Sequence, residues 1–254
     1  MRLCSNPAAR TSVCTTANSW ARRSDRTTTV VSMLIAEDLL LLATDDVSGK
    51  LLRSSSYVDV ALGGALLVEL VLADRVRLDG SGWRARAVVI DNRPLADPTL
   101  NAALARLAEK PPARPTAVVN RLAKGARKAL YAGMGARGIV TAVEHQVFGI
   151  FPSVRWPATS PQYEDQLRFV LREILLGVRQ PTSTEGALVS ILAGANMLKV
   201  IVPADQFKAA KARAKVLSQG NWASEAVRQS IAATQAATTA ALTATIAASA
   251  SSGS

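Results

Sequence analysis

The sequence predicts a mainly α-helical, single globular domain with two small β-hairpins. Apolar residues recur at helical spacing through most of the chain after residue 33, as they do when a helix buries one face. Two short stretches, 75–90 and 139–151, carry paired strand signals around a turn instead. Both cysteines lie within the first fourteen residues, so neither a disulfide framework nor a thiolate metal site is expected in the body.

The first 32 residues differ from the rest of the chain. They contain five arginines, one aspartate and many serines and threonines, without apolar periodicity. We interpret them as a disordered extension, with Met33 as an alternative translation start; an arginine-rich transit peptide is the other interpretation. The domain is expected to span residues 33–245, and the Ser- and Ala-rich residues 246–254 to form a flexible tail.

The domain begins with "MLIAEDLLLLATDD", in which four leucines lie between two pairs of carboxylates. Glu37 and Asp38 fall in the first turn of a predicted helix, where the helix dipole favours negative charge. Asp45 and Asp46 begin the following turn. Because the two pairs lie at opposite ends of one short helix, we interpret them as a helix start and a turn, not as a metal site.

A predicted helix then leads into each hairpin. Residues 59–73 show helical spacing, and the alternation after Ala73 predicts a strand that turns at the glycines and returns through "WRARAVVI". Asp97 as N-cap and Pro98 at the first helical position predict the next helix. Residues 116–134 are expected to form one helix. In the hairpin after it, "IV" begins a strand, "AVEHQ" is the turn and "VFGIF" is the return strand.

The C-terminal part of the chain is expected to be wholly helical. We expect neither the four-leucine run nor the Ala- and Thr-rich run 230–250 to span a membrane, and the latter is interpreted as a small-residue helix packed on the body. Helix starts are predicted near Ser160 and Pro161, Thr182 or Ser183, Asp205 and Asn221.

The net charge of +11 indicates a polyanionic partner, either nucleic acid or an anionic membrane surface. At 100° per residue, four cations of the predicted helix 116–134 fall within an arc of about 120° and its apolar residues occupy the opposite arc. A cation near an anionic leaflet contributes about 1 kcal/mol, so this face suits a membrane surface. These cations are Arg121, Lys124, Arg127 and Lys128.

Three blocks of the sequence resemble the Golgi phosphoprotein 3 (GPP34) family, which includes yeast relatives and many bacterial proteins; we expect a bacterial member. They are "LIAEDLLLLATDDVSGK", "GGALLVELVLADRVRL" and "ARGIVTAVEHQVFGIF", and a looser likeness continues to about residue 245. The resemblance implies a mainly helical, non-enzymatic domain that binds membranes peripherally through phosphatidylinositol 4-phosphate. It also implies an adaptor for cytosolic tails of membrane glycosyltransferases.

The resemblance also implies a headgroup pocket. Its two arginines three residues apart correspond to Lys124 and Arg127, its arginine before "LLVEL" to Gly63, and its tryptophan to about Ser54. Arg53 and Tyr57 lie near that tryptophan position and are candidate substitutes. The predicted lipid-headgroup residues are therefore Lys124, Arg127, Arg121, Lys128, Arg53 and Tyr57. In and after the second hairpin, four apolar residues are candidates either for membrane insertion or, more commonly, for core packing: Phe148, Ile150, Phe151 and Trp156.

A winged-helix-like nucleic-acid-binding protein is the alternative, because a helix followed by a hairpin occurs twice in a basic chain. Aromatic residues make up only 4% of the chain, which disfavours stacking on single strands. An enzyme is not expected, since the only histidine, His145, lies in a predicted polar turn and no phosphate-binding loop or nucleophile elbow is present. We therefore expect a cytoplasmic, peripherally membrane-associated protein without cofactor or metal, whose partners are anionic phospholipids and tails of membrane proteins; its oligomeric state is left open.

Overall fold

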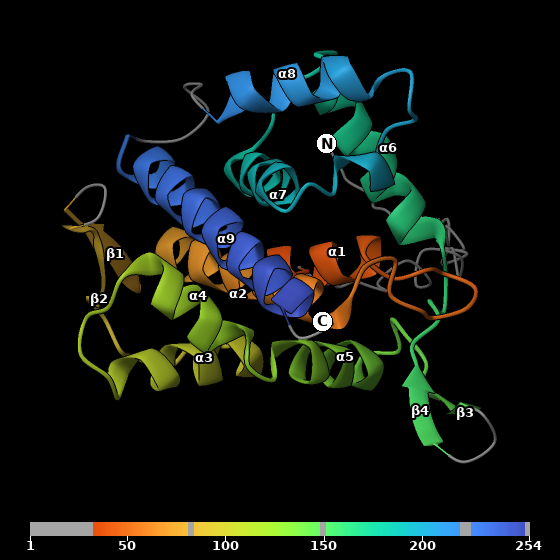
Figure 1. Ribbon diagram of the computed structural model, residues 1–254, viewed down its shortest axis with the longest axis horizontal. Helices are drawn as coiled ribbons and strands as arrows, with labels where there is room; N and C mark the ends of the chain where they lie inside the picture. The colour runs from red at the N-terminus through yellow and green to blue at the C-terminus, as the bar shows by residue number, and fades with distance from the viewer. Residues whose placement is uncertain (1–32, 81–83, 148–150, 219–224, 252–254) are drawn as a thin grey trace, which may run out of the picture. The chain divides into compact units, whose positions relative to one another are not determined.

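The computed structural model describes residues 33–80, 84–147, 151–218 and 225–251, and it confirms a mainly helical fold with two small antiparallel hairpins (Figure 1). The N-terminal residues 1–32 lie outside the described chain. The elements are α1 (Ile35–Leu42), α2 (Ser55–Leu72), β1 (Val76–Asp79), β2 (Arg86–Val89), α3 (Pro98–Ala108), α4 (Pro115–Ala123), α5 (Ala126–Ala136), β3 (Val143–Val147), β4 (Phe151–Arg155), α6 (Gln162–Leu175), α7 (Ser183–Gly194), the 3-10 turn η2 (Leu198–Val200), α8 (Phe207–Leu217) and α9 (Glu225–Ser251).

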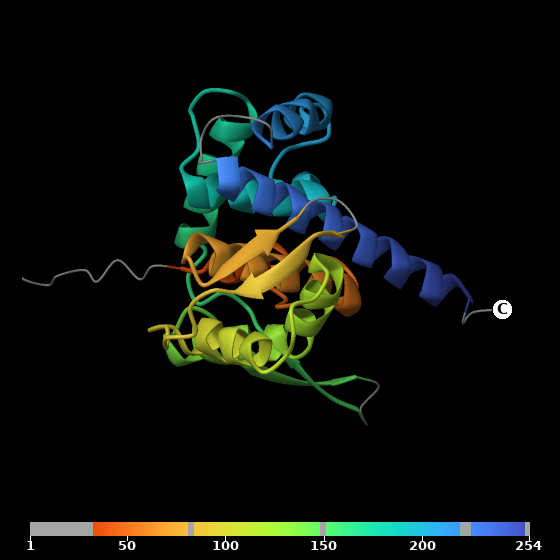
Figure 2. The same cartoon turned by 90° about the vertical axis from the view of Figure 1, so that its left-hand side faces the viewer.

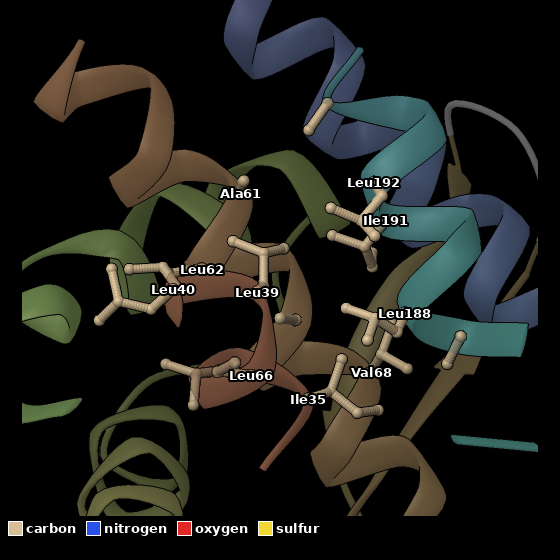
Figure 3. Packing of buried hydrophobic residues seen from close by; sticks show 14 of the residues in the cluster. Ile35, Leu39, Leu40, Ala61, Leu62, Leu66, Val68, Leu188, Ile191 and Leu192 are labelled. Atoms are coloured by element: carbon tan, nitrogen blue, oxygen red, sulfur yellow. The ribbon is translucent and has the colours of Figure 1, made fainter. Parts of the chain in front are cut away.

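The core forms where α1 packs between α2 and α7. All eight residues of α1 are buried, which explains why its leucines run consecutively instead of marking one face. Figure 3 shows Ile35 of α1, Val68 of α2 and Leu188 of α7 lying close together where these helices meet. Burial of several such side chains, each contributing about 1.5–3 kcal/mol, makes this layer the main hydrophobic stabilisation of the fold.

Helix α2 is the centre of this arrangement and contacts α1, α4, α7 and α9. Among the described helices, α2 is the one that is long and apolar enough to cross a membrane by length and composition alone. However, 72% of that apolar window is buried inside the domain, as in the core helix of a folded protein.

Two adjacent glycines let other helices approach α2 closely. A Cβ atom at Gly63 would clash with the carbonyl oxygen of Val119 and would lie 2.8 Å from the amide nitrogen of Ala123, both in α4. A Cβ atom at Gly64 would clash with the hydroxyl of Thr238 in α9. The backbone of α2 is therefore in contact with α4 at one glycine and with an α9 side chain at the next.

The first hairpin has the predicted form, with β1 and β2 paired from Val76↔Val89 to Asp79↔Arg86. In the second hairpin the prediction of a turn over 142–146 is wrong, because residues 143–147 form β3, paired with β4. The predicted strand residue Val140 makes only an isolated bridge to Ala158. The polar composition of β3 was misleading because a two-stranded hairpin buries little: even Val143 is 45% exposed.

The prediction of one helix over 116–134 is also wrong. The chain leaves α4 at Lys124, whose backbone is extended, and Gly125 then adopts a left-handed conformation with φ of 76° before α5 begins. Arg106 of α3 stabilises this break by donating from Nη1 to the carbonyl oxygen of Lys124 at 2.7 Å. The apolar spacing continues across the break, so periodicity alone did not reveal it.

Other helix starts lie where local signals place them. Asp97 caps α3 by accepting hydrogen bonds from the backbone of Thr99 and Leu100, and Thr182 caps α7. Helices α6 and α8 begin within two residues of the predicted starts. The predicted start of the last helix at Asn221 lies outside the described residues, and α9 continues past residue 245 to Ser251.

Candidate functional site

A cavity of about 660 Å³ lies between the loop after α1, the start of α5 and the end of β4. The loop contributes Lys50, α5 contributes Arg127 and Lys128, and the end of β4 contributes Arg155. Asp59 of α2 is the one carboxylate among the described residues that line it. The cavity is therefore cationic, with four basic side chains and one acidic side chain.

The first turn of α5 lies at this cavity. Its N-cap is Gly125, which has no side chain to accept a hydrogen bond from the free N–H groups of the first turn. The turn contains Arg127 and Lys128 and no acidic residue, although the positive end of a helix dipole disfavours cations. An anion bound here would accept hydrogen bonds from those N–H groups and would offset the repulsion between the dipole and the two cations.

Among the described residues, one of the four cations has an ion-pair partner. Arg127 Nε lies 3.0 Å from Asp59 Oδ1, and each side chain is about a third exposed. Burial raises the pKa of Asp59, and the neighbouring Arg127 opposes that rise. Within the described residues, Lys50, Lys128 and Arg155 form no ion pair, so three positive charges are available to a ligand.

An aromatic pair forms one wall of the cavity. The rings of Tyr131 and Trp156 stack with centroids 5.0 Å apart and planes 4° apart. The Tyr131 hydroxyl lies 2.7 Å from Thr44 Oγ1, and the Trp156 amide donates to the carbonyl oxygen of Gly49 at 3.3 Å. Gly49 has φ of 63°, and a Cβ atom there would lie 2.5 Å from the Trp156 nitrogen, so only glycine allows this approach.

Comparison with family models matches residues 35–234 to GPP34, the Golgi phosphoprotein 3 family. The chain belongs to the GPP34 family. The match covers every residue that lines the cavity. No curated protein sequence matched the chain.

The break between α4 and α5 separates the four cations predicted to share one GPP34 helix face. Arg127 and Lys128 line the cavity, and Lys124 is exposed immediately before Gly125. Arg121 instead lines a smaller cavity of about 150 Å³ beside β2 and the end of α3. The single face of about 120° predicted for these cations therefore does not form.

Arg53 and Tyr57 lie at another place in the GPP34 fold. The Arg53 guanidinium is 5.0 Å from the centre of the Tyr57 ring and donates to the Asn196 carbonyl oxygen at 3.3 Å. The Tyr57 hydroxyl donates to the carbonyl oxygen of Ala195, the C-cap of α7. Both side chains therefore cap the end of α7, and the structure does not bring them to the cavity.

Sequence reasoning missed Lys50 and Arg155 as site residues, because Lys50 lies in a loop and Arg155 ends a short hairpin strand, and neither has helical periodicity. Of the four apolar candidates near the second hairpin, Trp156 is half-buried against Tyr131. Residues 148 and 150 and the side chain of Phe151 lie outside what the structure describes. One feature of the sequence could have indicated Lys50. It lies in the loop after the first helix, where the family resemblance implies that a tryptophan contributes to the headgroup pocket.

The acidic residues at the start of α1 form a buried structural cluster. Glu37 forms an ion pair with Arg137 and accepts a hydrogen bond from the Leu34 amide. Asp38 accepts a hydrogen bond from the Tyr163 hydroxyl at 2.7 Å. Glu69 of α2 accepts one from the Ile35 amide, also at 2.7 Å. Burial raises the pKa of Asp38 to about 7 and that of Glu69 to about 8. Within the described chain, no group of His, Cys, Asp and Glu residues is arranged to hold a metal ion.

Proposed function

We propose that this GPP34-family protein binds the phosphorylated headgroups of anionic phospholipids reversibly at the cavity beside the start of α5. The observation that carries the proposal is a set of cations around the uncapped first turn of α5 that have no ion-pair partner in the described part of the chain: Lys50, Lys128 and Arg155. A phosphate group would satisfy both the side-chain charges and the helix N–H groups.

A headgroup that carries a phosphate monoester on a sugar-like ring fits this lining best. The monoester carries more charge than the diester of an ordinary phospholipid, which suits several converging cations. The stacked pair of Tyr131 and Trp156 offers a flat apolar surface for the ring of the headgroup. We therefore propose phosphatidylinositol 4-phosphate, or a phosphoinositide of the same chemistry, as the ligand.

The same proposal describes a peripheral membrane protein at the cytoplasmic surface. Each cation close to an anionic leaflet contributes about 1 kcal/mol, and exposed Lys124 adds to the attraction of the cavity residues. Family membership supports an adaptor role for the tails of membrane proteins. We propose a binding protein and not an enzyme, since Asp59, the carboxylate on the described lining, is already paired with Arg127.

Vesicle co-sedimentation tests this function directly. The full chain is mixed with neutral vesicles, with vesicles containing phosphatidylserine, and with vesicles containing phosphatidylinositol 4-phosphate at equal total charge. Lys128→Ala/Arg155→Ala removes two cavity cations, and Lys110→Ala/Arg114→Ala removes two exposed cations elsewhere. We expect selective binding to the phosphoinositide vesicles, weakened at least about tenfold by the cavity variant and unchanged by the control.

If the cavity variant and the control variant lose vesicle binding equally, or if the protein binds all anionic vesicles equally, the interaction is diffuse charge attraction and the proposed site is rejected. Absence of binding at low salt would reject the membrane function and favour the nucleic-acid alternative. Binding should also weaken as salt rises, because exposed charges are screened within about 8 Å at physiological ionic strength.

A further inference from the structure

The C-terminal part of the chain carries a second basic surface that the proposed headgroup site does not use. At 100° per residue, Lys208, Lys211 and Lys215 of α8 lie within an arc of about 60°, and the opposite side of the helix is buried. All three lysines are exposed. Within the described residues, none of their ammonium groups has an ion-pair or hydrogen-bond partner.

An apolar groove of about 550 Å³ runs beside these lysines. Leu198, Phe207 and Ala212 supply apolar lining, and Gln235 of α9 also lines the groove. Lys199 lies 5.3 Å from the centre of the Phe207 ring, which adds a fourth cation next to the apolar surface. This surface, the α8 groove, therefore combines an apolar lining with a cationic rim.

The charge of the rim indicates what can bind there. The chain's own residues 1–32 carry five arginines and one aspartate, and a second copy of the chain would bring a net charge of +11. Neither complements the rim. An acidic segment does, and electrostatic complementarity of this kind steers association and selects partners.

The spacing of the lysines indicates the form of the acidic segment. Positions 208, 211 and 215 follow the i, i+3, i+7 pattern of one helix face, over about 10 Å of helix length. Carboxylates at the same spacing on a partner helix would face them, and an apolar side chain between the carboxylates would enter the groove. This is the helix-in-groove mode of recognition.

The position of α8 favours a soluble partner over the bilayer. Within the described unit, Figures 1 and 2 both show α8 at one end and α5 with the β3–β4 hairpin at the other. A membrane bound at the cavity beside α5 would leave the α8 groove open to the solvent.

We propose that the α8 groove binds an acidic amphipathic helix of a soluble partner protein. The site is separate from the proposed headgroup cavity, so it can be tested without lipid, and failure of one proposal does not decide the other.

Fluorescence anisotropy of a labelled model peptide tests this binding. The probe is a peptide of about 14 residues, four helical turns, with glutamates at i, i+3 and i+7 and leucines between them on the same face. A scrambled peptide of the same composition is the ligand control. Lys211→Glu/Lys215→Glu reverses the rim charge, Ala212→Trp fills the groove without a charge change, and Lys110→Glu/Arg114→Glu is the matched charge reversal elsewhere.

We expect the amphipathic peptide to bind and the scrambled peptide to bind at least about tenfold more weakly. The rim reversal and Ala212→Trp should each weaken binding at least about tenfold, while the control reversal should leave it within about twofold. Circular dichroism checks that each variant is folded. Absence of binding, equal binding of the scrambled peptide, or equal loss in the control reversal would overturn the proposal, as would anionic vesicles competing fully for the groove.

Discussion

Arg127 of α5 and Asp59 of α2 form an ion pair, with Arg127 Nε 3.0 Å from Asp59 Oδ1, at the wall of the cationic cavity. The pair neutralises one of four cations and fixes its guanidinium beside the first turn of α5. It is partly exposed, so its contribution to folding is small, about 1 kcal/mol or less. The pair matters more for the charge of the cavity, because it offsets one of the four positive charges there.

Asp59→Asn is therefore expected to strengthen binding to anionic vesicles. The change releases the Arg127 charge, which corresponds to about 1 kcal/mol, or about a fivefold gain in affinity at low salt. Co-sedimentation at several salt concentrations measures the gain. Asp79→Asn, which removes an exposed carboxylate paired with Arg77, is the control. Weaker binding by Asp59→Asn would instead mean that Asp59 orients Arg127 for the ligand.

Two single glycine-to-alanine substitutions, one in α2 and one in α5, should have opposite effects on the stability of the fold. Gly63→Ala is expected to destabilise the fold by about 1–3 kcal/mol, because its Cβ would clash with the α4 backbone. Gly133→Ala in α5 is expected to stabilise it by about 0.5–1 kcal/mol, since the nearest atoms are 4.0 Å away and alanine is the better helix former. Urea unfolding compares the two, and equal effects would contradict the close packing of α2 on α4.

Stability should fall as the pH rises from about 5 to 8. Burial raises the pKa of Asp38 to about 7 and the pKa values of Glu69 and Glu164 to about 8. Above the unfolded-state pKa, near 4, the folded protein holds protons that the unfolded chain releases. The free energy of unfolding therefore decreases with pH, by up to about 1.4 kcal/mol per unit for each group, until the folded pKa is passed.

Glu69→Gln isolates one of these groups. Glutamine keeps the acceptor for the Ile35 amide but has no proton to lose and cannot become charged, so this variant should be more stable than the wild type at pH 8 and similar to it at pH 5. Glu109→Gln changes an exposed carboxylate and serves as the control. Urea unfolding across this pH range measures the slopes, and an unchanged slope in Glu69→Gln would remove Glu69 as its source.

Two substitutions in the stacked pair of Tyr131 and Trp156 are expected to affect stability and vesicle binding differently. Tyr131→Phe keeps the stack on Trp156 and loses the hydroxyl contact with Thr44, so we expect a loss of about 1 kcal/mol of stability and normal vesicle binding. Trp156→Ala removes the stack and one wall of the cavity, so it should reduce both the stability of the fold and vesicle binding. Thermal unfolding and co-sedimentation test the pair, and normal binding by folded Trp156→Ala would exclude the wall from the site.

The sequence predicted helices that local signals define. Helix α3 begins at the pair Asp97 and Pro98, where the Asp97 side chain caps the first turn. Helix α7 begins with a capping box formed by Thr182 and Glu185. The three motif blocks indicated the GPP34 family, which the match over residues 35–234 confirms. In each case the information lies within a few adjacent residues or in a continuous motif.

The errors arose where contacts distant in the sequence act on the backbone. The break at Lys124 and Gly125 is stabilised by Arg106, eighteen residues away, and α4 packs on Gly63. Gly63, the position to which the family resemblance assigns an arginine, therefore makes a packing contact with α4 in this protein.

The sequence by itself determined the mainly helical class, the family and the basic character of the protein, because periodicity, caps and charge are properties of neighbouring residues. Only the tertiary structure decided which cations converge. Lys50, Arg127 and Arg155 meet because Trp156 stacks on Tyr131 and donates to Gly49, which brings the loop after α1, the start of α5 and the end of β4 together. Contacts across about a hundred residues of chain depend on packing, which no local pattern encodes.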